Sequence, residues 1–314
     1  MRLDILAAIS GFMIAFQARA NGELSHRLGN GFEAALVSFS SGLIIIILIA
    51  LFHPGIKDGI RKVLTSVNKG ELARWKLLAG ALGGTFVALQ TQIVPLVGVA
   101  IYSVASIAGQ TAMSLGVDRV GLTGGGPKPI SRRRVGAALI TVLAIYVSVF
   151  DRLDSHNLPI LAVVGAAIAG AVVGVQRALN GQINEHSGQS FATSFFNFLT
   201  GSSLLFLVLI FVTVTKRHEL VALPAGPWWI YTGGVIGVIY IAFSATIVQH
   251  VGVLTFTLFS VGGQLLSSFL IDLFSPTHGV HVSAYLATGI VMTYLGVIVG
   301  GVNNSQHRKA PKQQ

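Results

Sequence analysis

Two pairs of amide side chains stand out in this sequence by their spacing. Gln17 and Asn21 are four residues apart, and Gln176 and Asn180 repeat that spacing. On a helix, residues four apart share one face, so each pair predicts a polar patch able to donate and accept hydrogen bonds. The alternative is that Asn21-Gly22 and Asn180-Gly181 only terminate helices. The glutamine one turn earlier is harder to explain in that way.

Two polar stripes form the second set of candidates. Each repeats at intervals of four residues: Ser106, Gln110, Ser114 and Asp118, then Ser260, Gln264, Ser268 and Asp272. A step of four advances about 40° past a full helical turn, so each set forms one slowly drifting stripe. Such stripes are expected to face other helices or a wet cavity rather than hydrocarbon. They either line a substrate pathway or join helices by hydrogen bonds.

Residue patterns typical of enzymes and metal sites are missing from the sequence. It has no cysteine, and no serine nucleophile is flanked by a base. His278 and His281 have a metal-like spacing, but zinc requires three or four ligands. The 11 acidic residues lie near predicted helix ends or in loops. Asp118 and Asp272 come closest to a buried carboxylate, with a simple boundary charge beside Arg119 as the alternative for Asp118. We therefore expect no catalysis, metal or cofactor.

The composition indicates which elements must position these residues. Hydrophobic residues make up 53% of the chain, charged residues only 10%, and the mean hydropathy is +0.74. Soluble domains carry roughly 25% charged residues. Apolar runs of about 20 residues recur, which is the length that crosses a bilayer as a helix. The sequence therefore predicts an all-α membrane protein, and its 37 glycines suit close helix packing in lipid.

Ten spans are predicted, at roughly 3–22, 32–52, 76–96, 98–118, 135–150, 159–178, 190–214, 228–248, 251–272 and 283–302. The start of the first span also resembles a signal peptide, although its mid-chain echo favours a helix. Between the second and third spans, Ile56, Ile60 and Val63 recur at helical spacing opposite basic residues. This segment is either an amphipathic helix on the inner leaflet or a solvated basic loop.

The chain contains two copies of one sequence repeat. Gly11–Gly22 is echoed by Gly170–Gly181, and Gly98–Asp118 by Gly252–Asp272, with seven of 21 positions identical in the second comparison. We expect a first five-helix repeat at 1–150, a second at 151–302 and a polar cytoplasmic tail at 303–314. Because five is odd, the second repeat begins on the opposite side of the membrane. Inverted repeats are typical of secondary transporters.

Basic residues predict the orientation. With both termini in the cytoplasm, 16 of the 21 Lys and Arg residues lie inside, leaving Arg19, Arg27, Arg152, Lys216 and Arg217 outside. This agrees with the positive-inside rule. The net charge of +10 therefore marks loops that face the cytoplasm and anionic lipid, not nucleic acid.

With the repeat in view, the chain resembles two fused copies of the YdcZ-like domain, a branch of the drug/metabolite transporter superfamily of bacterial inner-membrane exporters. The motifs of the first copy are Gln17-x-x-x-Asn21, Ser38-Phe39-x-x-Gly42, Gly109-Gln110, Asp118-Arg119-x-Gly121, Ser131, Arg134 and Gly136. Those of the second are Gln176-x-x-x-Asn180, Asn197-Phe198-x-x-Gly201, Gly263-Gln264 and Asp272. The resemblance implies a ten-helix bundle, a cavity between the first four helices of each half, and export of small molecules.

These observations predict a multi-pass transporter of the bacterial inner membrane that exports small molecules by alternating access. The predicted substrate-binding residues are Gln17, Asn21, Gln110, Gln176, Asn180 and Gln264, with Ser106, Asp118, Ser260 and Asp272 as secondary candidates. Uncharged lining of this kind favours neutral, zwitterionic or hydrophobic small molecules over strongly cationic drugs. A proton is a candidate coupling ion. The alternative function is a membrane scaffold or regulatory subunit that transports nothing.

Overall fold

The structure is a computed structural model that describes residues 3–122, 127, 129–152, 160–216, 221–251, 253–276 and 281–301. Within these residues every regular element is an α-helix or a short 3-10 helix, which confirms the predicted all-α fold. The predicted tail at 303–314 lies outside the described residues. His278 lies outside them as well.

A helix lies over each of the ten predicted spans, and an additional short helix follows the second. The helices are α1 (Leu3–Leu28), α2 (Gly31–Phe52), α3 (Pro54–Asn68), α4 (Ala79–Val97), α5 (Val99–Arg119), α6 (Arg132–Ser148), α7 (Ile160–Ser187), α8 (Ser190–Lys216), α9 (Gly233–Val251), α10 (Val253–Phe274) and α11 (Ala284–Gly301). Three 3-10 turns lie at Arg74–Leu78, Phe150–Arg152 and Trp228–Tyr231.

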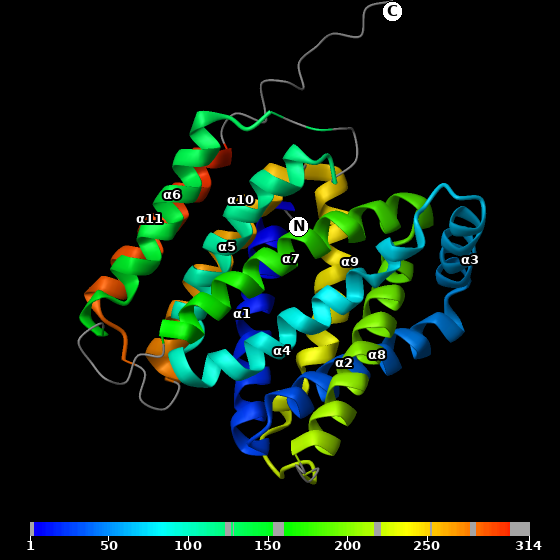
Figure 1. Ribbon diagram of the computed structural model, residues 1–314, viewed down its shortest axis with the longest axis horizontal. Coiled ribbons are helices and arrows are strands. Elements are labelled where there is room, and N and C mark those ends of the chain that lie inside the picture. The colour runs from blue at the N-terminus through cyan, green and yellow to red at the C-terminus, as the bar shows by residue number, and fades with distance from the viewer. Residues whose placement is uncertain are drawn as a thin grey trace, which may run out of the picture.

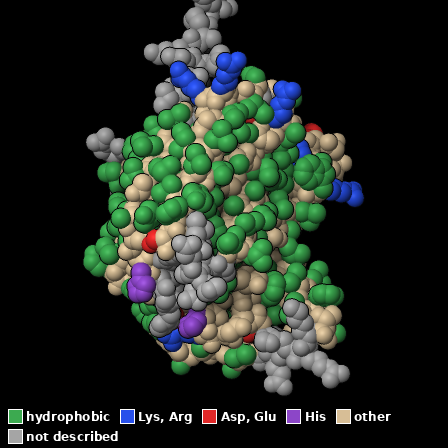
Figure 2. Space-filling view, turned by 60° about the vertical axis from the view of Figure 1, so that its left-hand side comes forward, with side chains coloured by type: hydrophobic (Ala, Val, Ile, Leu, Met, Phe, Trp, Pro, Cys, Tyr) green, Lys and Arg blue, Asp and Glu red, His purple; other side chains and the backbone are tan. Residues whose placement is uncertain are grey.

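The outer surface of the bundle is apolar. Figure 2 shows hydrophobic side chains covering most of one face, with Lys and Arg gathered toward its upper edge. Leu51 on α2 and Phe211 on α8, for example, are 58% and 67% exposed. By length and composition, five described helices could each cross a membrane: Gly31–Phe52, Arg74–Val97, Val99–Arg119, Ile160–Ser187 and Ser190–Thr215. Exposed apolar surface of this extent is costly in water and favourable in lipid.

The helices are arranged in three groups across the molecule. α6 and α11 lie side by side at one edge, and α2, α3 and α8 lie at the opposite edge (Figure 1). Between them, α1 packs along α10, and α5 packs along α7. Each of these two central pairs therefore combines a helix from residues 1–150 with one from residues 151–302.

Glycines let the two central pairs pack backbone against backbone. A Cβ atom added at Gly170 of α7 would lie only 1.8 Å from the carbonyl oxygen of Ser106 on α5. A Cβ at Gly11 of α1 would lie 1.8 Å from the carbonyl oxygen of Ser260 on α10. Real Cβ atoms do not approach other atoms this closely, so at both crossings only glycine permits the observed helix separation.

Two phenylalanines pack at the crossing of α2 and α8. The ring centroids of Phe39 and Phe198 lie 5.1 Å apart, and both side chains are buried. Each ring lies over a glycine of the other helix: Phe198 over Gly42, and Phe39 over Gly201. This exchange of equivalent contacts places one aromatic pair where the two halves meet.

The segment after α2 forms the helix α3, whose apolar face packs against protein. Ile56 and Val63 are fully buried, and α3 contacts α7 and α8. Gly59 makes a close approach to Ala192 possible. Of the two interpretations of this segment, the structure has the amphipathic helix and not the solvated loop, and the buried apolar residues of that helix contact protein. Basic residues such as Arg61, with 80% of its side chain exposed, occupy the opposite face.

Candidate functional site

The amides of α1 bond to two other helices inside the bundle. Gln17 Nε2 donates to the carbonyl oxygen of Gly233 on α9 at 2.8 Å, and Asn21 Nδ2 donates to Gln90 Oε1 on α4 at 3.2 Å. Gln17 is 9% exposed, and Asn21 and Gln90 are fully buried. A Cβ at Gly237 would lie 2.9 Å from Gln17 Nε2. The absence of a side chain at Gly237 on α9 therefore leaves room for the Gln17 amide.

The amides of α7 converge on one asparagine of α8. Gln176 Nε2 and Asn180 Nδ2 donate to Asn197 Oδ1, at 2.8 and 3.3 Å. Gln176 is 7% exposed and Asn197 is 2% exposed. A Cβ at Gly83 of α4 would lie 2.4 Å from Gln176 Nε2. The contact of Gln176 with Gly83 is the counterpart of the contact of Gln17 with Gly237.

Neither amide pair ends a helix, because α1 continues to Leu28 and α7 to Ser187. The helix-terminating interpretation of Asn21-Gly22 and Asn180-Gly181 is therefore wrong. Some polar atoms of the two clusters are buried without a hydrogen-bond partner among the described residues, namely Asn21 Oδ1, Gln90 Nε2 and Asn180 Oδ1. Because a buried unpaired polar atom is costly, these atoms are candidates for contact with a ligand or water.

The polar stripe on α5 contains both a fully buried residue and partly exposed ones. Ser106 is fully buried where α5 crosses α7, whereas Gln110 is only partly buried. Gln110 Nε2 donates to Ser106 Oγ at 3.2 Å, and its Oε1 accepts from Arg177 Nη1 at 2.6 Å. Ser114 Oγ and Asp118 both bond to Arg134 of α6, with 2.5 Å between Arg134 Nη1 and Asp118 Oδ2. The C-terminal end of this stripe therefore joins α5 to α6.

The stripe on α10 is more deeply buried. Ser260, Gln264 and Asp272 are 5%, 3% and 2% exposed. Ser268 is fully buried and donates to the carbonyl oxygen of Leu265 at 3.0 Å. Asp272 accepts from backbone N–H groups at the start of α5. The Ser268 hydroxyl therefore bonds within its own helix, as serines in helices commonly do.

The structure brings the predicted residues together in groups, not in one site. Gln176 and Asn180 share Asn197, and Gln110 lies beside Ser106. Four further polar residues complete these groups and were not predicted from the sequence: Gln90, Arg177, Asn197 and Tyr240. Asn197 could have been found, because it aligns with Ser38 in the repeat. Arg177 could have been found as a charged residue directly after Gln176.

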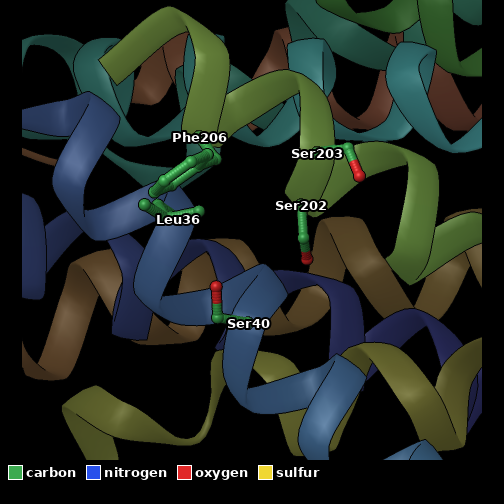
Figure 3. A pocket seen from close by; sticks show the side chains of 5 residues that line it. All are labelled: Leu36, Ser40, Ser202, Ser203 and Phe206. Atoms are coloured by element: carbon green, nitrogen blue, oxygen red, sulfur yellow. The ribbon is translucent and has the colours of Figure 1, made fainter. Parts of the chain in front are cut away.

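A separate open groove lies between α2 and α8. Its lining consists of Leu36, Ser40, Ser202, Ser203 and Phe206, and Figure 3 shows Ser40 and Ser202 between the helices with Leu36 and Phe206 beside them. Ser202 Oγ is buried and has no hydrogen-bond partner among the described residues. The groove holds none of the predicted amides.

Metal binding finds no support in the described part of the chain. No group of three His, Cys, Asp or Glu side chains lies close enough together there to hold a metal ion. His281 is described, but His278 is not, so the histidine pair is not tested.

A family comparison covers both halves of the chain. Residues 3–147 and 161–299 each match the family model DMT_YdcZ, described as "Putative inner membrane exporter, YdcZ". The chain belongs to this exporter family. The two matches cover both predicted repeats, so the two-copy resemblance is confirmed. The YdcZ family assignment, together with the apolar helices, identifies a multi-pass transporter of the inner membrane.

Comparison with solved structures supports the fold alone. One crystal structure aligns over 98% of this chain and 98% of its own, with a TM-score of 0.57 and 14% sequence identity. No curated protein matches the chain.

Proposed function

We propose that this YdcZ-family protein is a secondary transporter that exports small organic molecules by alternating access. In this proposal ten helices span the membrane as two inverted five-helix repeats, with both termini in the cytoplasm. The amide clusters on α1 and α7 are the core of the substrate pathway. They lie where helices of the first half meet helices of the second, which is where inverted-repeat transporters bind substrate.

Reciprocal contacts support a two-fold relation between the halves, which the proposed inverted repeat requires. Gly11 contacts Ser260 just as its repeat partner Gly170 contacts Ser106. The exchange of Phe39 and Phe198 between α2 and α8 has the same form. A two-fold axis that exchanges the halves produces such pairs of equivalent contacts, because each contact then occurs twice with the roles reversed.

One difference between the halves carries the proposal of alternating access. α1 packs against α4 within the first half, where Asn21 bonds to Gln90. No comparable packing joins their repeat partners, α7 and α9, in the described residues. With both termini inside, the α1–α4 contact lies toward the outer side and the looser α7–α9 side faces the cytoplasm. This is the arrangement expected of an exporter that is open to its cytoplasmic substrate.

An export measurement tests the proposal. Cells that overproduce the protein and cells that lack it are grown in parallel, and the small molecules in their media are compared by mass spectrometry. We expect specific compounds to accumulate outside the overproducing cells, and a protonophore to reduce their release if protons drive export. Identical media from both strains, with the protein folded in the membrane, would favour the alternative of a scaffold that transports nothing.

A further inference from the structure

Arg177, an exposed side chain at the eighteenth of the 28 positions of α7, bonds to two other helices. Its Nη1 donates to Gln110 Oε1 on α5 at 2.6 Å, and its Nη2 donates to Tyr240 Oη on α9 at 3.0 Å. Gln110 is the twelfth of 21 residues in α5, and Tyr240 is the eighth of 19 in α9. Both partners thus lie well inside their helices. The exposed guanidinium group of Arg177 therefore reaches from α7 to the middle turns of two other helices.

Arg177 has no acidic partner among the described residues. The carboxylate of Asp118, two turns further along α5, pairs with Arg134. A guanidinium group has five N–H donors, and the bonds to Gln110 and Tyr240 use two of them. The oxygen of Tyr240 accepts from Arg177, and the described part of the chain offers no acceptor for its hydroxyl hydrogen. The remaining N–H donors of Arg177 and the hydroxyl of Tyr240 therefore lie close together and carry one net positive charge.

The fold itself does not require this charge. In the first repeat the equivalent position is Ala18, which is 1% exposed and packs in the interior. Arg177, in contrast, is exposed and Tyr240 is partly exposed. Arg177 reaches across the side where α7 and α9 lack the close packing that joins α1 to α4. The guanidinium group therefore lies on an exposed side of α7, next to α9.

We propose that Arg177, Tyr240 and Gln110 form a binding site for the carboxylate group of an organic anion. Arg177 supplies the charge and a planar set of donors, which fits a carboxylate. Tyr240 donates its free hydroxyl hydrogen, and Gln110 holds the guanidinium group in position. A single guanidinium charge balances a monocarboxylate, whereas a phosphate dianion would keep excess negative charge in the membrane. This inference rests on the proposed transport function, and it replaces the expectation of a neutral substrate with that of an anionic one.

Ligand binding to the purified full-length protein tests the site directly. Benzoate, its neutral counterpart benzamide, and inorganic phosphate are titrated into detergent-solubilised protein while its melting temperature is followed. We expect stabilisation by benzoate but not by benzamide or phosphate. Arg177→Gln should weaken the apparent benzoate affinity at least about tenfold, because it removes a charge-assisted hydrogen bond. The control Arg61→Gln, on the exposed face of α3, should bind like the wild type.

The Arg177→Lys variant guards against a simple loss of folding. It keeps the charge but not the planar set of donors, so it should fold and retain intermediate benzoate affinity. Stabilisation by benzamide or phosphate equal to that by benzoate would overturn the site, as would no stabilisation by benzoate. Unchanged affinity in Arg177→Gln would also overturn it. Export measurements in cells distinguish failure of the binding site from failure of the proposed transport function. Arg177-dependent benzoate binding without any export would support the site and contradict the transport function. If the protein exports neutral compounds and Arg177→Gln does not change that export, the carboxylate site is contradicted and the transport function is supported.

Discussion

The carboxylate of Asp272 accepts a hydrogen bond from the backbone N–H of Ala100, with 2.7 Å between Oδ2 and the nitrogen. Its Oδ1 accepts from the N–H of Val99 at 3.2 Å. The first N–H groups of a helix have no partner within the helix and carry partial positive charge. The end of α10 thus caps the start of α5, and this contact joins the two halves. Asp272, a secondary candidate for substrate binding, has a structural contact that accounts for its burial.

Removing this cap should destabilise the protein. Asp272→Ala leaves two buried N–H groups unpaired, so we expect a loss of roughly 1–3 kcal/mol. The loss would appear as a lower melting temperature in detergent. Asp58→Ala is the matched control, because Asp58 forms only an exposed ion pair with Arg61 at 3.5 Å. Equal melting temperatures for the two variants would show that the cap contributes nothing.

The glycine crossing of α5 and α7 gives a second prediction. Gly170→Ala places a Cβ against the backbone of Ser106, so the helices must separate. We expect a loss of roughly 1–3 kcal/mol in stability. Gly181→Ala, on the same helix, meets no atom within 4 Å and should be neutral or slightly stabilising. Thermal melting of both variants tests this, and similar behaviour of the two would contradict the close packing.

Substitution of the buried glutamines separates transport from packing. Gln17→Leu and Gln176→Leu each remove a hydrogen bond between helices, which should reduce stability by about 1 kcal/mol. If these amides line the pathway, export per folded molecule should fall much further than the amount of folded protein. Gln92→Leu is the control, because Gln92 is exposed and bonds only to its own helix. Variants that melt early yet export normally would remove both glutamines from the site.

Single cysteines can determine the topology, since the natural sequence has none. Lys69, at the end of α3, and Val221, after α8, are both exposed. With both termini in the cytoplasm, Lys69→Cys lies inside and Val221→Cys lies outside. A membrane-impermeant maleimide added to intact spheroplasts should therefore label only Val221→Cys. Labelling of Lys69→Cys alone would reverse the orientation.

The sequence predicted the helices because their signals are local. Apolar runs gave ten helices, and the four-residue spacing of Gln17 and Asn21 identified a polar helix face correctly. Partners were not predictable in this way, because they depend on which helices meet. Nothing near Asn197 in the chain indicates that two amides of α7 converge on it, and nothing near Asp272 indicates a cap on α5. Likewise, periodicity revealed the apolar face of α3 but not that α7 and α8 would cover it.

The pairing of α1 with α10 also has a consequence for how the protein is assembled. Gly11 and Ser260, which meet at that crossing, are separated by 249 positions in the chain (260 − 11). In the proposed ten-span topology, α1 therefore enters the bilayer first and meets its main partner only after nearly all other helices have been inserted. Insertion of single helices and their later association are distinct stages. Because contacts so distant in sequence form slowly, final packing of this bundle should be a late, post-insertion event.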